Sequence, residues 1–227
     1  MRARALLAAS PLIVSILACG LAGGESDEPP PPLPQPPPVV APPPAPTPPT
    51  PPPPPGRIVN REAAGNLAPT RPALGCIEAT HIESSMNPAD LYASMEACAR
   101  ADRPQDALLL FGLAGVYGRF DTLRVADRSA HQATRVLRDR HVEVVPPGQW
   151  ARVQQLLGQT TGDPAELARF CGRVRAVGHP TYHPAYMIQH GMGAFLGQGG
   201  DPLVPGFDPA AGWESALDSY LHCPPLR

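Results

Sequence analysis

The sequence contains no lysine, so arginine supplies every basic side chain other than histidine. Acidic and basic residues nearly balance, with 20 Asp and Glu against 18 basic residues and a formal net charge of −2. A chain this close to neutral lacks the positive excess that draws a protein to nucleic acid or to a strongly anionic surface. We therefore expect no nucleic-acid partner, and we attribute the missing lysine to genome composition.

Short catalytic motifs are absent as well. The chain has no GxSxG nucleophile elbow, no HExxH pair with its glutamate base and no GxxxxGKS/T phosphate loop. Its cysteines show no CxxC or similar zinc-binding spacing. We therefore expect no metal and no cofactor, and the sequence leans against an enzyme without excluding one.

The first 18 residues have the composition of an export signal. Arg2 and Arg4 precede the apolar stretch ALLAASPLIVSILA, which is too short to cross a bilayer and remain there. Residues 16–19, ILAC, resemble the lipobox of bacterial lipoproteins. This resemblance implies cleavage before Cys19 and acylation of that residue, which would anchor the protein to a membrane. An ordinary secretory signal with a cysteine near the cleavage site is the alternative.

Proline dominates residues 29–55, within the segment 19–56. Such a tract has almost no apolar surface to bury and is expected to be a disordered linker, extended as polyproline II at about 3.1 Å per residue. Its reach would then be on the order of 80 Å, which suits a semi-rigid spacer. The PxxP spacing also matches ligands of SH3-type modules, but we interpret the segment as a tether between a lipid anchor and a folded domain.

Residues 57–227 have the composition of a single globular domain, and its helices begin with a recurring signal. Asn87, Asp163 and Asp208 each precede a proline, so a capping side chain is followed by a residue that needs no N–H partner. Glu166 completes a capping box with Asp163, and the segment that begins at Asn87 imitates one.

Helical periodicity follows these signals. We expect helices over 88–101, 104–118 and 121–140, further helices around 150–157 and 167–174, and a last helix near 209–222. The segment 104–118 is apolar nearly all round, which predicts a central helix covered on several sides. VEVV at 142–145 is the only short strand candidate. The pattern predicts an all-α domain, an irregular bundle of about six or seven helices.

Four cysteines of this domain form an even set in a chain expected to leave the reducing cytosol: Cys76, Cys98, Cys171 and Cys223. Four cysteines allow three pairings. We favour Cys76–Cys98 and Cys171–Cys223, because each pair joins neighbours in the expected helix order. A four-cysteine metal site is the weaker alternative, because no metal-like spacing occurs.

One stretch, DLYASMEACARADRPQDALLLFGLAGVYG, resembles a helical hairpin of the tetratricopeptide or Sel1-like kind. The likeness lies in Leu91 and Tyr92 of the first helix, the short polar turn, and the spacing of Ala107 and Phe111 in the second. The resemblance implies two closely packed antiparallel helices. A stable array needs about three repeats, and no second copy follows at a similar period, so we expect one hairpin within a non-repetitive bundle.

Basic residues gather on one face of the expected helix 121–140. Arg124, Arg128, His131, Arg135 and Arg138 would fall within about 80° on a wheel of 3.6 residues per turn. The planar arginine side chain suits carboxylates and phosphates, so this stripe is a candidate surface for an acidic protein partner or an anionic envelope polymer. A solvated face of local Arg–Asp pairs, worth about a few tenths of a kcal/mol each, is the alternative.

The stretch HPTYHPAYMIQHGMGAF, residues 179–195, is a candidate ligand pocket through five side chains: His179, Tyr182, His183, Tyr186 and His190. His179 and His183 have a zinc-like spacing, but each precedes a proline, which disfavours helical geometry in the residue before it. His183 and His190 could still align across two turns of a helix that starts at Pro184. Packing of these residues into the core, with satisfied polar ends, is the alternative.

Together these features predict a lipid-anchored protein of the bacterial cell envelope whose helical domain binds a protein partner or acts as a scaffold. Gly20 stands where some lipoproteins carry an aspartate retention signal, so the resemblance favours the outer membrane, facing the periplasm or the surface. A periplasmic hydrolase or small-ligand-binding protein that uses the region 179–201 is the alternative. An immunity lipoprotein is a third hypothesis within the binding class.

Overall fold

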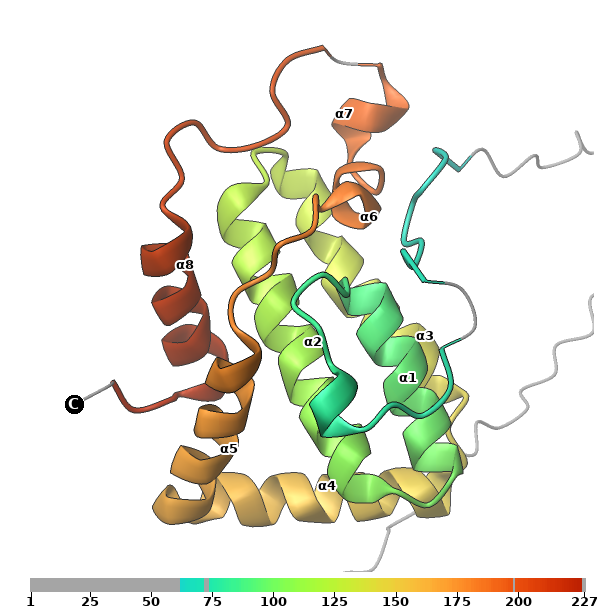
Figure 1. Cartoon of the computed structure of the whole chain (residues 1–227). Coiled ribbons are helices and arrows are strands. Elements are labelled where there is room, and N and C mark those ends of the chain that lie inside the picture. Colours follow the sequence, from blue (N-terminus) through green and yellow to red (C-terminus); the bar gives the residue numbers. More distant parts are fainter. Residues whose placement is uncertain (1–61, 72–73, 198, 226–227) are drawn as a thin grey trace, which may run out of the picture. The chain divides into compact units, whose positions relative to one another are not determined.

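Helices dominate the residues that the computed structural model describes, which are 62–71, 74–197 and 199–225. The predicted signal peptide, the lipidation site Cys19 and the proline-rich linker lie outside this part of the chain. The α-helices follow one another in the order shown in Figure 1: α1 Pro88–Arg100, α2 Pro104–Arg124, α3 Ala133–Glu143, α4 Pro147–Gly162, α5 Pro164–Val177, α6 Ala185–Ile188, α7 Met192–Phe195 and α8 Pro209–Ala216.

Three shorter helical segments complete the fold: η1 Ala79–His81, η2 Arg128–Gln132 and η3 Leu217–Leu221. Within 62–71, 74–197 and 199–225 there is no β-strand, only an isolated bridge between Val125 and Leu203. The predicted all-α class is therefore confirmed. The strand candidate at 142–145 was wrong, because its first two residues end α3. None of the helices in this part of the chain is long and apolar enough to cross a membrane.

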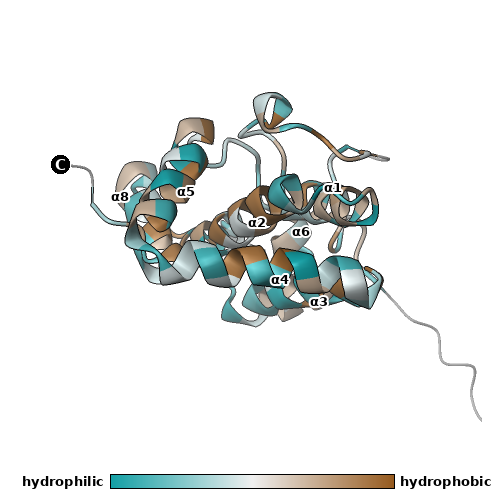
Figure 2. Cartoon of the chain, turned by 90° about the horizontal axis from the view of Figure 1, so that it is seen from below, coloured by the Kyte–Doolittle hydropathy of each residue, from teal (hydrophilic) through white to brown (hydrophobic). Residues whose placement is uncertain are grey.

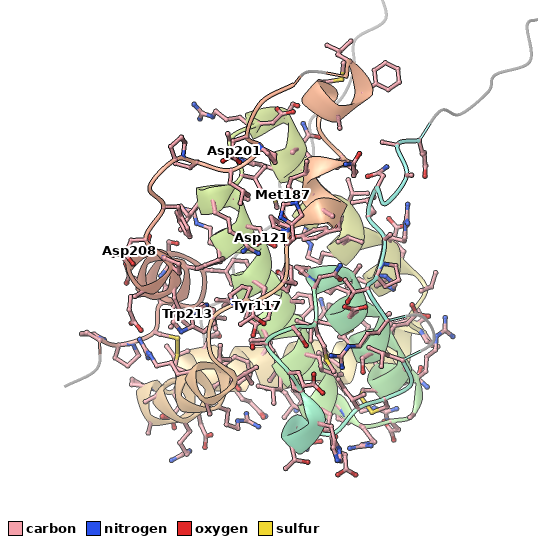
Figure 3. The ribbon with its side chains drawn as sticks, turned by 45° about the horizontal axis from the view of Figure 1, so that its top comes forward. Tyr117, Asp121, Met187, Asp201, Asp208 and Trp213 are labelled. Carbon is pink, nitrogen blue, oxygen red and sulfur yellow. A yellow bond between two sulfur atoms is a disulfide. The ribbon has the colours of Figure 1, made fainter. Side chains whose placement is uncertain are left out.

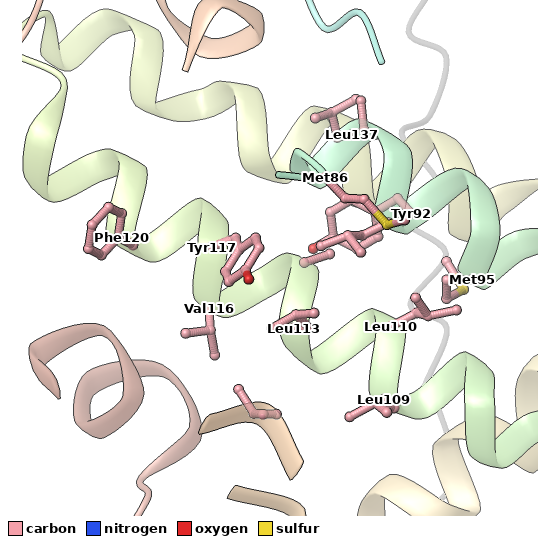
Figure 4. Packing of buried hydrophobic residues seen from close by; sticks show 14 of the residues in the cluster. Met86, Tyr92, Met95, Leu109, Leu110, Leu113, Val116, Tyr117, Phe120 and Leu137 are labelled. Atoms are coloured by element: carbon pink, nitrogen blue, oxygen red, sulfur yellow. The ribbon is translucent and has the colours of Figure 1, made fainter. Parts of the chain in front are cut away.

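The predicted central helix is α2, which packs against α1, α3, α4, α5 and α8. Its buried side chains point in several directions, as Figure 4 shows for Leu110, Leu113, Val116 and Tyr117. In Figure 2 hydrophobic residues run along α2, whereas α4 and α5 also carry hydrophilic residues. An apolar helix is stable in this position because its neighbours remove nearly all of its surface from water.

Three glycines of α2 lie three residues apart and allow close approach on successive turns. At Gly112, Gly115 and Gly118 an added methyl group would overlap a side chain of another element, so no larger residue suits these positions. The neighbours, in the same order, are Phe170 of α5, Tyr220 of η3 and Thr134 of α3. The glycines thus set how near three other elements come to the axis of α2.

The predicted proline-containing helix starts are present, but the capping boxes are distributed differently. At α1 the Asn87 side chain accepts from Asp90 N, and the Asp90 carboxylate accepts from Asn87 N, so the box is reciprocal. At α5 the Asp163 side chain caps the helix, but the Glu166 carboxylate pairs with Arg169 instead. The complete box therefore forms at α1 and not, as predicted, at α5.

The predicted continuous helix over 121–140 was wrong. α2 ends at Arg124, and the chain then turns through Val125 before η2 and α3 begin. Val125 forms the bridge with Leu203, and the Asp127 side chain accepts from Ser129 N and starts a new helical segment. The backbone groups that would have extended α2 are instead hydrogen-bonded to the distant segment around Leu203 and to the cap formed by Asp127.

Two disulfides join the elements in the pairing that the sequence favoured. Cys76, which precedes η1, is bonded to Cys98 of α1. Cys171 of α5 is bonded to Cys223, which follows η3. The second bridge holds the C-terminal helical segment against α5, next to α2.

Candidate functional site

The segment 178–208 crosses one end of the bundle, and part of it is attached to one face of α2. Tyr117, Asp121 and Arg124 are four and three residues apart, so they share a helix face. The Tyr117 hydroxyl donates to the Gly178 carbonyl at 2.9 Å, and Arg124 donates to the Tyr182 carbonyl at 3.0 Å. Figure 3 shows Tyr117 and Asp121 along this face.

Asp121 is the centre of this attachment and is fully buried. The hydroxyls of Tyr182 and Tyr186 each donate to its Oδ2 at 2.8 Å. Arg124 approaches the other oxygen, with Nε at 2.8 Å and Nη2 at 2.7 Å from Oδ1. A buried carboxylate is tolerated because each of its oxygens accepts charge-assisted or hydroxyl hydrogen bonds.

Burial governs the protonation of this cluster. Removal from water raises the pKa of the Asp121 carboxyl, while the Arg124 charge and the tyrosine hydrogen bonds act in the opposite direction. Burial also raises the pKa of Tyr182 and of Tyr186 well above the usual range, so both remain neutral hydrogen-bond donors. The two tyrosines are therefore structural, and they fix the segment 178–208 on α2.

A cavity of about 390 Å³ opens beside this cluster. Arg124 and Phe120 of α2 line it, and the His179 ring stacks on Phe120 at a centroid distance of 6.2 Å. Its far wall is formed by residues 201 and 203–207. The lining combines apolar surface with one guanidinium, one imidazole and the Asp201 carboxylate, which suits a small amphipathic molecule whose acidic group contacts Arg124 and His179.

A second cavity, of about 680 Å³, adjoins the first, since Asp201 lines both. Its walls include Asp127 and Arg128 on one side and several glycines between residues 193 and 200 on the other. Both cavities are thus bounded by the same irregular stretch of chain that follows α7.

The structure separates the five predicted pocket residues. Tyr182 and Tyr186 are buried in the core, as the alternative interpretation held, and only His179 lines a cavity described above. His183 is exposed, whereas His190 bonds through Nδ1 to Asn66 at 2.9 Å. The predicted two-turn alignment of His183 and His190 was wrong, because α6 is a single turn that ends at Ile188. Within the described parts of the chain, no three His, Cys, Asp or Glu residues converge as a metal site.

The predicted arginine stripe is also divided, because its residues do not share one helix. Arg124 belongs to α2, and its side chain is only 12% exposed, stacked over the rings of Phe120 and Tyr182. Arg128 opens η2, while two others lie on α3. Those two, Arg135 and Arg138, both pair with Asp139, at 3.5 and 2.8 Å respectively.

An exposed apolar group on α7 was not predicted from the sequence. Met192, Phe195 and Leu196 are 53%, 59% and 61% exposed, and no residue of α7 is buried. The α7 backbone is nevertheless attached to η2, because Met192 N donates to the Ser129 hydroxyl at 2.8 Å and Gly193 N to Asp127 at 2.9 Å. The sequence signal for this group is the apolar run MGAFL between two glycines, which is missed when the region is interpreted only as a glycine-rich loop.

No protein-family model, no curated protein and no solved structure matches the chain. The lipobox-like and tetratricopeptide-like resemblances therefore stay predictions from the sequence. The candidate functional features of this chain are the exposed α7 group and the two cavities beside it.

Proposed function

We propose that the protein is a lipid-anchored component of the bacterial cell envelope whose helical domain binds a protein partner. The binding surface would be the α7 surface, defined as Met192, Phe195 and Leu196. The observation that carries this proposal is the exposure of all three side chains, each above one half, on neighbouring positions of one short segment. Contiguous exposed apolar groups of this kind are typical of interaction sites.

The residue types favour a protein partner. Phenylalanine and methionine are enriched in the centres of interfaces, where burial of apolar surface contributes to the stability of a complex. Methionine also adapts to irregular surfaces through its unbranched, polarizable side chain. The α7 surface therefore offers the apolar centre of an interface, with its side chains already directed away from the domain.

Its surroundings carry charges of both signs, because Asp127, Arg128 and Asp201 all line the adjoining cavity. Arg128 is exposed, lines the adjoining cavity with Gly193 and Ala194, and takes part in no ion pair among the described residues. The bonds that the α7 backbone donates to Ser129 and Asp127 hold it in place, which reduces the entropy lost on binding. An apolar pocket with a polar rim that carries both charge signs is the complementary surface, and the predicted proline-rich tether would let the domain reach such a partner away from its own membrane.

The test is affinity capture from a detergent-solubilised envelope extract, followed by measurement of binding to the purified partner. A partner recovered by the wild-type protein should bind the Phe195→Asp variant at least about tenfold more weakly, as expected for loss of a central interface residue. The matched control is Val144→Asp, because Val144 is also a large exposed hydrophobic residue, at 47%, but lies after α3.

Equal capture by the wild type and by Phe195→Asp would refute the α7 surface as the binding site. Equal loss in Phe195→Asp and Val144→Asp would point to a general effect of added negative charge. Circular dichroism of each variant establishes that the helical fold is unchanged, so that weaker binding is not mistaken for unfolding.

A second candidate function is small-ligand binding in the cavity lined by Arg124 and His179. Its volume, about 390 Å³, lies within the usual range for ligand sites, about 300–1,000 Å³. No serine, threonine or cysteine lines it, so a covalent hydrolytic mechanism is less favoured than binding. Thermal-shift measurements with small aryl and alkyl carboxylates test this function. His179→Ala should weaken the shift and His183→Ala should not, because His183 is exposed and does not line the cavity.

A further inference from the structure

A third, smaller cavity lies between α2, α3 and η3, away from the residues of the α7 surface. Its volume is about 160 Å³. The sequence pointed to two of its arginines, but not to Arg119 or to the C-terminal tyrosine that completes it. The polar side chains that line it come from α1, α2, α3 and η3 and include Arg119, Arg135, Arg138, Tyr92, Thr134 and Tyr220.

Two glycines of α2 shape this cavity. Gly115 lets the Tyr220 ring lie directly against α2, and Gly118 does the same for Thr134 of α3. Any side chain at these positions would push Tyr220 or Thr134 outward. The two hydroxyl-bearing residues are therefore held at the cavity by the packing of the core and not by surface contacts alone.

The charges around the cavity are unbalanced. Arg119 donates from Nε to the Ser219 hydroxyl at 3.0 Å and pairs with no carboxylate among the described residues. Arg135 and Arg138 share one carboxylate, Asp139, and the hydrogen bond from Arg138 lowers the pKa of that group. Arg119, Arg135 and Arg138 thus line the cavity, and only one carboxylate in the described part of the chain, that of Asp139, pairs with any of them. The excess of guanidinium groups leaves a net positive charge at this small concave surface.

The tyrosines add neutral donors to these charges. Burial is the main cause that raises the pKa of Tyr92 and the pKa of Tyr220. The charge of Arg138 acts on both in the opposite direction. Both phenols are therefore protonated at neutral pH, and because the two hydroxyls interact with each other, one hydrogen is left for donation to a ligand. The Tyr220 residue is 36% exposed, while its hydroxyl end lies against Gly115 of α2.

We propose that this cavity, the α2–α3–η3 cavity, binds a tetrahedral oxyanion, a phosphate or sulfate group. Arginine presents N–H groups in a planar fork that bonds such oxyanions strongly, and charge-assisted bonds of this kind are the strongest hydrogen bonds in proteins. The volume is small, which suits a single anionic group better than an extended molecule. The group could be a free ion or the head of a larger molecule, and the shared chemistry is the oxyanion.

The first experiment titrates the purified protein with inorganic phosphate at constant ionic strength, followed by calorimetry and by thermal unfolding. Saturable binding should raise the unfolding temperature as the phosphate concentration increases. Arg119→Gln and Arg138→Gln should each weaken the affinity by about tenfold or more, since each removes a charge-assisted donor. The matched control is Arg152→Gln of α4, which removes the same charge where Arg152 pairs with Asp102.

Absence of saturable binding in the wild type would overturn the proposal. So would an equal loss of affinity in Arg152→Gln, because phosphate would then be attracted by overall charge alone. Tyr220→Phe keeps both the charge and the ring packed on Gly115, so it should weaken binding by a smaller factor, about threefold to tenfold, without unfolding the protein.

Three further titrations distinguish the source of the group. Sulfate should compete with phosphate, and acetate should not, if the site selects a tetrahedral oxyanion; equal competition by acetate would refute that selectivity. A phosphate monoester that binds more tightly than inorganic phosphate identifies the head of a larger molecule as the ligand. Equal affinities for the monoester and for phosphate identify the free ion.

Discussion

The α1–α2 hairpin and the segment 178–208 are stabilised in different ways. The hairpin consists of two regular helices that contribute a large share of the buried core, and a disulfide fixes the chain before η1 to α1. The described part of the segment 178–208 has two one-turn helices, and it buries Tyr182, Tyr186 and Met187 but leaves the α7 surface exposed. Little of it is regular structure, and Asp121 fixes both of its buried tyrosines, so we expect its stability to depend strongly on that carboxylate.

The largest expected effect concerns Asp121. Asp121→Ala removes the acceptor of both tyrosine hydroxyls and leaves Arg124 without its carboxylate partner. Breaking a buried ion pair costs about 3–5 kcal/mol, so we expect the free energy of unfolding to fall by that amount in urea denaturation. Tyr186→Phe removes only one donor and should cost about 1–3 kcal/mol. A loss below about 1 kcal/mol for Asp121→Ala would show that the segment is held by other contacts.

The second prediction compares the two disulfides. Cys171 and Cys223 are 52 residues apart and enclose the whole segment 178–208, whereas Cys76 and Cys98 are 22 residues apart. In the chain-entropy model, closing the longer loop stabilises the fold by about 4 kcal/mol and closing the shorter loop by about 3.5 kcal/mol. The double variant Cys171→Ser/Cys223→Ser should therefore unfold at lower urea than Cys76→Ser/Cys98→Ser. Hydrogen exchange should locate the additional loss in the segment 178–208, and a reversed order would contradict this account.

The third prediction concerns the close approaches along α2. Gly118→Ala places a methyl group against Thr134, a short branched side chain that cannot swing aside as the far ends of Phe170 or Tyr220 can. We expect a net loss of about 1–2 kcal/mol, because overpacking outweighs the better helix propensity of alanine. Gly158→Ala in α4 is the control, since nothing lies within 4 Å of its added methyl group. That variant should gain about 0.5–1 kcal/mol, and similar results for both glycines would contradict the packing argument.

The smallest expected effect is a pH dependence at the edge of the segment 178–208. Burial, and secondarily the charge of Arg140, lowers the pKa of His190 from its usual 6.5. A lowered pKa in the folded state means that the unfolded chain binds the proton more readily. The contribution of His190 to stability is therefore complete above pH 6.5 and is lost as the pH falls through the lower, folded-state pKa.

This dependence is measured as the difference in urea midpoint between the wild type and His190→Gln across pH 8 to 5. The wild type should lose more stability than the variant on acidification. Parallel curves, or a wild type that gains on the variant at low pH, would contradict the assignment. The bond from His190 to Asn66 identifies the segment 62–71 as the region to monitor by NMR.

The sequence was most informative where structure depends on neighbouring residues. Helix starts at Asn87, Asp163 and Asp208, the all-α class and the apolar character of α2 follow from local capping and periodicity, and all are present in the structure. The disulfide pairing followed from the order of the helices. The continuous helix over 121–140 failed because the bridge between Val125 and Leu203 depends on a segment far away in the chain.

The candidate sites show the same limit. Tyr182 and Tyr186 were named from their composition, but their role depends on Asp121, some 60 residues earlier, and no local pattern connects the three. The α2–α3–η3 cavity joins Arg119 to Tyr220, about a hundred residues apart in the chain. The side chains that the glycines of α2 bring together cannot be matched from their positions in the sequence, because these positions do not tell which helices pack against each other.

The disulfide between Cys171 and Cys223 also determines the product that a single proteolytic cut would give. The exposed positions between Gly199 and Asp208 are the places where a cut is easiest, since they lie outside the regular helices. A cut there would give two fragments, and the disulfide between Cys171 and Cys223 would still join them. A nicked molecule would thus keep α8 and η3 attached to α5, and its mass would rise only by the water taken up in hydrolysis until a reductant separated the two pieces.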